Sequence, residues 1–506
     1  MKRLKITSFL TMSSAGIALC LNFAGCSSMT ASHPTNGPFQ TTGIKICEVT
    51  SESAVIWTRL CEHAERVNNP EAETTTDFIY EKNGVKLEWP DQTPVVSYPE
   101  GITVETLHGA VPGTAGEVQV WYRLKEQRKW LKTEWQAVDP EADFIAQVPL
   151  SGLVPGRRYS IEVHCRKDKR SGSGQVVAGE FKTVPLVSEE SPVNFTVVAC
   201  QGIGTMDIPG RGHQTYGAMQ ALKPDFFVHT GDILYYDRDP GYAVNEPLAY
   251  YRWQRMFSLP ENMEFYQRVS SYFMKDDHDT LCNDTWRGCP WNTRQGELTF
   301  DDGLRIFKEQ TGMNDSETYR TVRWGKHLQI WMVEGRDYRS PNTMEDGPDK
   351  TIWGPEQMAW FKKTVQESDA TFRILISPTP VVGPDRPGKS DNHSNAAFDF
   401  EGNKLREFLA AQKDMIVVCG DRHWQYVSRD NKTGLMEYCT GSVSDAHAGG
   451  YRKDLRDTAT NLYVAVRGGF LNGRIDLENG SPKLLMRHYS STGELLNEDI
   501  RVAGQR

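Results

Sequence analysis

The stretch FFVHTGDILYY, at residues 226–236, decides the fold of this chain. Its apolar run, 226–228, leads directly into the polar cluster His229-Thr230-Gly231-Asp232. The same change follows five other apolar runs, at residues 195–199, 272–274, 330–333, 374–376 and 415–419. Helix-like stretches separate the runs. Buried strands that repeatedly end in acids, histidine or cysteine predict one layered α/β domain over residues 192–500, with its strand ends facing a common site.

Four side chains at these strand ends carry the chemistry: Asp232, Asp277, Asp421 and His423. Carboxylates that converge on one place repel one another and shift each other's pKa unless a cation lies between them. Oxygen-rich ligands with one imidazole suit calcium, manganese, iron or zinc. The pattern therefore predicts a metal site.

Residues 38–185 show a different, β-rich pattern. Runs 44–49 and 54–60 flank a polar turn, which fits a hairpin. Runs 159–165 and 179–183 are expected to be the last two strands, and the less regular segment 70–147 is expected to hold an insertion. This region is predicted to be a β-sandwich that precedes the layered domain.

The composition is that of a globular protein, with 38% hydrophobic and 24% charged residues. A length of 506 residues allows two to four domains, and the two patterns reduce the number to two. The formal net charge is -9 and no long basic run is present, which argues against a nucleic-acid partner. We expect a monomer.

The N-terminus has the pattern of a targeting segment. Residues 1–26 begin with the basic group Lys2, Arg3 and Lys5, continue with a mostly apolar stretch, and end in small residues before Cys26. The ending Phe23-Ala24-Gly25-Cys26 resembles a bacterial lipobox, whose cysteine becomes the lipidated first residue. We expect a lipoprotein signal peptide, a polar tether at 27–37, and an exported, membrane-anchored protein facing the periplasm or cell surface. Ordinary cleavage nearby, with free secretion, is the alternative.

The spacing of Gly231-Asp232, Asp277-His278 and Gly420-Asp421-Arg422-His423 resembles the calcineurin-like metallophosphoesterases. At some motif positions this sequence differs from the usual pattern of those enzymes, for example with Ala199-Cys200-Gln201 after the first strand. These differences resemble the alkaline phosphatase D (PhoD-like) family. That family carries a fibronectin-like domain in front of its phosphatase domain. Residues 153–159 (LVPGRRY) also resemble the fibronectin type III corner. The resemblance implies a fibronectin III-like β-sandwich followed by an α/β metallophosphoesterase domain.

The resemblance also implies a ligand set. Cys200, Asp232, Tyr235, Asp421 and His423 would surround an iron ion, and Asp232 would bridge to a calcium ion that Asp277 also binds. A thiolate and a phenolate are strong donors for a highly charged iron, whereas calcium prefers oxygen. Manganese or zinc remain alternatives. Tyr236 could take the place of Tyr235.

Three further residues are candidates for catalysis. His278 follows a proposed ligand and could donate a proton or a hydrogen bond to the scissile phosphate. Arg336, near Arg339, could bind phosphate oxygens in a bidentate fork. His393, in the loop 391–395, could supply a metal or phosphate contact.

The resemblance implies a metal-dependent hydrolase of phosphate esters. The N-terminal segment implies that this hydrolase is exported and meets the membrane only through its lipid anchor. A phospholipase D-like phosphodiesterase and a surface binding protein with an inactive phosphatase domain are the alternatives. Seven mature cysteines remain besides Cys26 and Cys200, an odd number that cannot all pair. Cys282 and Cys289 are close enough in sequence to close a loop with a disulfide.

Overall fold

The computed structural model describes residues 37–504, apart from residues 83, 87–90, 239–240, 314–315, 387, 453–458 and 479–480. The expected signal peptide and residues 27–36 of the tether lie outside the described residues. Among the described helices, none has the length and apolar character to cross a membrane.

The N-terminal strands form two sheets that enclose one apolar core. The predicted hairpin is confirmed as β1 (Ile44–Cys47) and β2 (Ser53–Arg59), and β10 (Ile145–Ser151) pairs with β2. The second sheet holds β7 (Glu117–Leu124), β11 (Arg158–Arg166) and β12 (Ser173–Lys182), with β8 (Leu131–Lys132) and β9 (Gln136–Ala137) at its edge. Ile46, Ile56 and Val148 from one sheet share the core with Val120 and Ile161 from the other.

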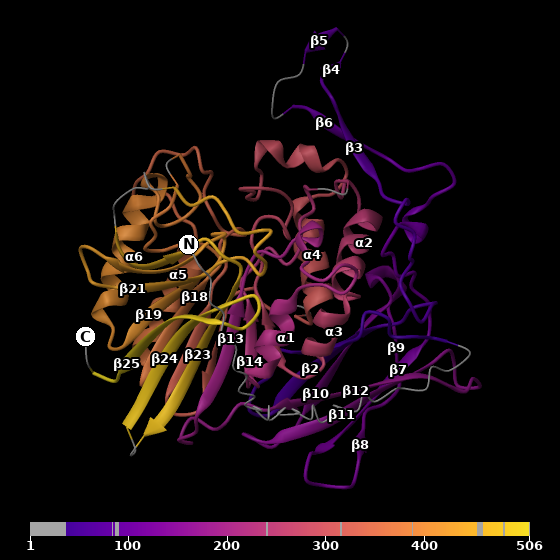
Figure 1. Cartoon of the computed structure of the whole chain (residues 1–506), viewed down its shortest axis with the longest axis horizontal. Helices are drawn as coiled ribbons and strands as arrows, with labels where there is room; N and C mark the ends of the chain where they lie inside the picture. Colours follow the sequence, from indigo (N-terminus) through magenta and orange to yellow (C-terminus); the bar gives the residue numbers. More distant parts are fainter. Residues whose placement is uncertain are drawn as a thin grey trace, which may run out of the picture. The chain divides into compact units, whose positions relative to one another are not determined.

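The turn before β11 has the corner contact that its sequence predicts. The Tyr159 hydroxyl accepts a hydrogen bond from the backbone N–H of Val154 at 2.9 Å. The insertion is shorter than expected, because β7 belongs to the sandwich. It includes a paired arm, at the top of Figure 1, of β3 (Thr75–Ile79), β4 (Glu81–Lys82), β5 (Val85–Lys86) and β6 (Thr93–Ser97), followed by the short helix η1 (Val104–Thr106). Helix η2 (Pro140–Ala142) precedes β10.

The sandwich and the following domain share one nine-stranded sheet. Strand β1 pairs in parallel with β15 (Ser270–Phe273), which continues through β14 (Phe226–His229) and β13 (Val193–Val198). Three antiparallel strands complete the sheet: β23 (Gly469–Glu478), β24 (Ser481–Ser490) and β25 (Leu495–Val502). The change of sequence pattern near residue 185 therefore does not coincide with a break in the sheet.

A seven-stranded sheet lies against the first. Its order is β16 (Arg320–Trp324), β17 (Leu328–Met332), β18 (Phe372–Ser377), β19 (Met415–Cys419), β21 (Met436–Thr440), β20 (Gln425–Asp430) and β22 (Ala459–Ala465). All six predicted strands are confirmed, but they divide three and three between two mixed sheets rather than forming one layer. Val197, Phe226, Ile330, Ile374 and Ile416 pack in the apolar core between the sheets.

Helices cover the outer faces of both sheets (Figure 1). Apolar side chains of α1 (Gln214–Ala221), α2 (Glu246–Phe257), α3 (Pro260–Tyr266) and α4 (Phe300–Thr311) pack with the nine-stranded sheet. Those of α5 (Gly354–Glu367) and α6 (Asp399–Ala411) pack with the seven-stranded sheet. Short helices η3 (Ile203–Thr205), η4 (Pro290–Gln295) and η5 (Ala396–Phe398) lie in the connecting loops. Because each central strand has apolar neighbours on both faces, the polar residues collect at the strand ends.

The eight cysteines of the described residues are all free and buried. The disulfide that the spacing of Cys282 and Cys289 allowed is therefore not formed. The Cys282 thiol instead lies 3.7 Å from the side-chain oxygen of Asn292, in the helix η4 that follows Cys289.

Candidate metal centre

The carboxyl ends of four strands, three in the nine-stranded sheet and one in the seven-stranded sheet, bring the predicted metal ligands together. Cys200 follows β13, Asp232 follows β14, Asp277 follows β15, and His423 follows β19. In the described part of the chain, three overlapping groups have possible ligand atoms within 4.8 Å of one another. These groups are Cys200–Asp232–His423, Asp232–Asp277–His278 and Asp232–Asp276–Asp421. Asp232 belongs to all three, so it lies at the middle of the cluster.

Three of these residues have a left-handed backbone. The φ angles of Cys200, Asp232 and Asp421 are 53°, 54° and 60°. A left-handed conformation is unfavourable for residues with a Cβ, and for cysteine more so than for aspartate. Such strain costs on the order of 1–3 kcal/mol per residue and typically occurs at functional sites. Here it occurs at three strand ends around one centre, which indicates that the backbone is held there to position these side chains.

The Asp232 carboxylate is surrounded by groups suited to a cation. Its Oδ2 lies 3.3 Å from the Cys200 thiol and 3.2 Å from the Tyr235 hydroxyl. Its Oδ1 is buried and has no hydrogen-bond partner among the described residues. Burial, together with Asp277 and Asp276, raises the pKa of Asp232 well above its usual value. Burial and the neighbouring Asp232 likewise raise the pKa of Cys200 and of Tyr235. A bound cation would stabilise the deprotonated form of all three groups and so lower their pKa values, which means that the donor set fits a metal.

The structure distinguishes between the two neighbouring tyrosines. The Tyr236 hydroxyl accepts a hydrogen bond from the Trp253 indole at 2.6 Å, within the apolar core beside the first sheet. The Tyr235 hydroxyl instead lies between Asp232 and His447, 3.3 Å from the His447 Nε2. Tyr235 is therefore the tyrosine that faces the centre.

Two histidines meet on the other side of the centre. The rings of His423 and His447 are 4.3 Å apart. Burial, then the adjacent His447 and Arg422, lowers the pKa of His423 to about 2, so its imidazole is neutral, as a metal ligand must be. His447 was not among the predicted ligands. Its loop is tied to the centre because Val443 N–H donates to the Cys200 carbonyl at 3.4 Å.

Arg336 holds the acidic pair that follows β15. Its Nε donates to Asp276 Oδ1 at 2.6 Å, and its Nη2 lies 3.6 Å from both Asp277 and Asp391. The Arg336 side chain is fully buried. The sequence suggested that Arg336 binds the substrate phosphate. In the structure its guanidinium instead contacts carboxylates of the protein. Although burial opposes ionisation, Arg336 and His278 lower the pKa of Asp277, which keeps it an anion.

His278 is oriented by an acid that sequence reasoning missed. Its Nδ1 lies 2.6 Å from Asp237 Oδ1. Burial alone would lower the pKa of His278, but Asp237, Asp277 and Asp232 outweigh burial and raise this pKa to about 10. Asp237 fixes the ring through Nδ1, which leaves Nε2 for another contact.

His393 is not brought into the centre. Its Nε2 lies 3.0 Å from Glu401 of α6, and its ring packs edge-on against Trp353. Glu401 also accepts the backbone N–H of Ile352 at 2.6 Å, so this carboxylate draws His393 away from the strand ends. In the same loop, Asp391 lies 3.6 Å from Arg336, which holds the acids that follow β15.

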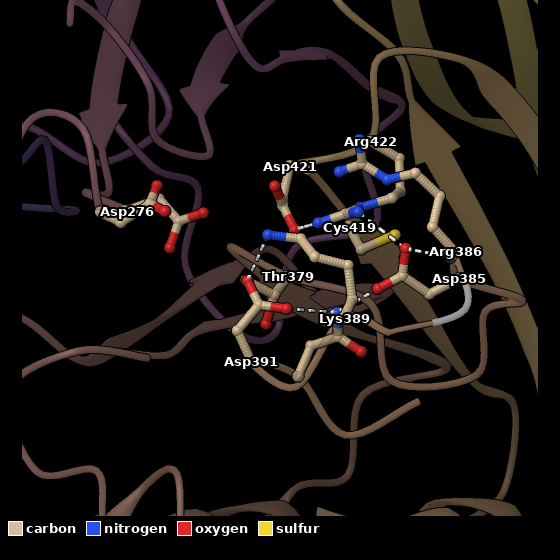
Figure 2. Close-up of polar contacts among 12 residues, drawn as sticks. Asp276, Thr379, Asp385, Arg386, Lys389, Asp391, Cys419, Asp421 and Arg422 are labelled. Carbon is tan, nitrogen blue, oxygen red and sulfur yellow. Dashed lines mark hydrogen bonds and ion pairs between the residues drawn. The ribbon is translucent and has the colours of Figure 1, made fainter. Parts of the chain in front are cut away.

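Figure 2 shows ion pairs in and around this loop, among Asp385, Lys389, Asp391, Asp421 and Arg422. Lys389 lies 3.4 Å from Asp391 and 2.6 Å from Asp284, and Arg422 lies 2.7 Å from Asp385. Arg422 also pairs with Asp421. Asp385 is thereby linked through Arg422 to a predicted ligand, Asp421.

Gly231 explains why a glycine precedes the central aspartate. Its φ is 116°, and a Cβ there would lie 2.7 Å from the backbone nitrogen of Asp276 and 2.9 Å from the carbonyl carbon of Lys275. Both atoms are backbone, so the two strand ends would have to separate. The close approach brings Asp232 beside the acids that follow β15.

The Gly231→Ala variant is expected to lose about 1–3 kcal/mol of unfolding free energy and much of its metal affinity. Denaturant unfolding and metal titration measure the two effects. Gly101→Ala is the matched control, since its φ is 73° but no atom lies within 4 Å of the added Cβ. An equally small loss in both variants would contradict this role of Gly231.

The two facing sheets, with acids, a cysteine and a histidine gathered at their strand ends, form a metallophosphoesterase fold like that of PhoD and purple acid phosphatase. A model of the family described as PhoD-like phosphatase matches residues 195–468, more than half of the 506 residues. The chain therefore belongs to the PhoD-like phosphatase family, as its motifs predicted, and it is a phosphoric ester hydrolase.

Two solved structures share the fold. A structure of PhoD has a TM-score of 0.64 at 16% identity and covers 93% of this chain and 90% of its own. Purple acid phosphatase PPD1 from yellow lupin (Lupinus luteus) seeds has a TM-score of 0.58 at 13% identity and covers 90% of this chain and 73% of its own. None of the curated proteins compared with the chain matches it.

Proposed function

We propose that this phosphatase hydrolyses phosphate esters with a centre of two or more metal ions. Cys200, Asp232, Tyr235, Asp421 and His423 would hold one ion, Asp232 would bridge, and Asp277 would hold a second. The observation that carries the proposal is the Asp232 carboxylate, which is common to all three groups and has a buried oxygen without a hydrogen-bond partner in the described chain.

The donor atoms support iron on one side and calcium on the other. A buried thiol and phenol next to Asp232 are donors that a highly charged ion holds deprotonated. The side of Asp277 and Asp276 offers carboxylate oxygen, which calcium prefers. Metal ions at such a site withdraw charge from a phosphoryl oxygen and lower the pKa of water.

The residues of the chain would divide the remaining work. Asp237 orients His278, so that its Nε2 can give a proton to the leaving oxygen of the ester. Arg336 holds Asp276 and Asp277 in place from within the protein. The chain thus supplies both the acid and the fixed carboxylates that phosphoester hydrolysis needs.

We also propose that the phosphatase is exported and anchored through a lipid on Cys26, and that its β-sandwich is a fibronectin III-like domain. The basic, apolar and small-residue order of residues 1–26 supports the first statement, and the Tyr159 corner supports the second. The intact mass of the mature protein tests the anchor, since an unmodified N-terminus would contradict it.

Elemental analysis of the purified protein tests the metals. The account predicts iron and calcium bound together in protein that hydrolyses an aryl phosphate. Zinc alone in fully active protein would contradict the iron and calcium assignment, although it would leave phosphoester chemistry intact. The same sample, assayed against monoesters, diesters and phospholipids, tests which phosphate ester is preferred.

A further inference from the structure

A cavity of about 370 Å³ opens beside the metal centre. Tyr235 and His447 belong to both the cavity and the centre. Its volume falls within the range of roughly 300–1,000 Å³ that is usual for small-molecule sites. The cavity is therefore placed to receive the part of a substrate that is attached to the reacting phosphate.

The cavity wall is largely apolar. Ile203, Leu234 and Met256 line it, together with the ring of Tyr242. Leu234 and Met256 are themselves part of the buried core beside the first sheet, so this wall is fixed by packing. An apolar or aromatic group would lose water-exposed surface by binding here, which favours such a group.

Three arginines line the same cavity, but two of them already have partners. Arg255 forms a bidentate pair with Glu73, at 2.6 and 2.8 Å. Arg252 donates to the backbone carbonyl of Arg238 at 2.7 Å. These contacts hold the two guanidinium groups to the protein.

The guanidinium of Arg238 is different. It is exposed, and within the described ranges it forms no ion pair or hydrogen bond. It lies over the Tyr235 ring, 4.3 Å from the ring centroid, and this stacking fixes its direction. The Tyr235 hydroxyl points to Asp232, whereas Arg238 covers the face of the ring. Asp237 also lines the cavity. Tyr235, Asp237 and Asp232 outweigh burial and raise the pKa of Arg238, although no described carboxylate lies within ion-pair distance of its guanidinium. The Arg238 cation is thus available at the cavity for a direct contact with an anion.

We infer that the cavity binds the alcohol part of the phosphate ester, and that Arg238 selects esters whose alcohol part is apolar and carries its own negative charge. The inference rests on the proposed function, because it assumes that the ester reacts at the neighbouring centre. A carboxylate, a sulfonate or a second phosphate group on the alcohol part would serve equally, since each accepts hydrogen bonds from a guanidinium. Arg238 is in this account a specificity-determining residue.

Two substrates of matched shape test the inference: phenyl phosphate and 3-carboxyphenyl phosphate, whose leaving phenols are of similar acidity. We expect the wild type to have a kcat/KM about tenfold higher for the carboxylated ester, the effect of one hydrogen bond between charged groups. Arg238→Ala should remove this preference, so that the ratio of the two kcat/KM values falls to about one. Arg157→Ala, which removes an exposed arginine paired with Glu126 in the β-sandwich, should retain the preference.

The outcomes separate this inference from the proposed function. Equal kcat/KM for the two esters in the wild type, or an equal loss for both in Arg238→Ala, would overturn the inference while hydrolysis itself supports the proposed function. Hydrolysis of neither ester by metal-loaded wild type would overturn the proposed function first. Thermal unfolding of Arg238→Ala is measured alongside, and an unchanged midpoint shows that any change in preference comes from the lost cation.

Discussion

Asp232→Asn is expected to lower kcat/KM for an aryl phosphate by about 1,000-fold or more, since even partners that only orient a metal ligand are worth 10–100-fold. Asparagine keeps the size of the side chain but removes the negative charge of Asp232, the residue that is common to all three ligand groups. The contacts with Cys200 and Tyr235 would remain possible, so the fold should persist. Steady-state kinetics with phenyl phosphate measures the loss.

The stability of this variant needs its own measurement. Burial and the charges of Asp277 and Asp276 outweigh the attraction of His278 and disfavour the charged form of Asp232. An uncharged asparagine should therefore leave the metal-free protein as stable as before, or more so. Asp301→Asn, at an exposed aspartate paired with Arg287, is the matched control and should retain full activity. Activity of Asp232→Asn within tenfold of the wild type would rule out a centre built on Asp232.

His278→Gln is expected to lower kcat by about 100- to 10,000-fold, the usual contribution of a positioned acid or base. Glutamine can accept or donate a hydrogen bond, but it cannot deliver a proton as imidazolium does. Bound metal should remain at the wild-type level, because the proposed role of His278 is toward the leaving group. Metal content and kcat are measured on the same preparation.

Asp237→Asn should give a smaller loss, since it removes only the acid that orients His278. The two substitutions together should cost little more than His278→Gln alone, because both act through one imidazole. Loss of metal from His278→Gln would instead make His278 a ligand, as its place beside Asp232 and Asp277 allows, and would contradict its role as the acid.

Local pattern predicted the strands but not their pairing. The runs at 226–228 and 374–376 have the same apolar, two-faced character, yet one lies in the nine-stranded sheet and the other in the seven-stranded sheet. A strand that is buried on both faces has the same apolar sequence pattern whether a helix or another sheet covers it. The pairing of β1 with β15 joins residues more than 200 positions apart, and no local signal in the sequence marks it.

The candidate site was predictable where ligands follow strands. Cys200, Asp232 and His423 each follow a buried run within four residues, and the structure gathers their donor atoms. His447 lies in a loop after β21 without such a run, so its place beside His423 depends on tertiary structure. His393 shows the opposite case, because a loop histidine among polar residues resembled a site residue but pairs with Glu401.

The most direct test of the metal centre is a titration of metal into protein that has been stripped by chelation, with bound metal and hydrolysis of phenyl phosphate measured on each sample. The account predicts negligible activity in the stripped protein and a rise in proportion to occupancy, which Asp232→Asn should not show. Full activity in wild-type protein that retains no bound metal would contradict it.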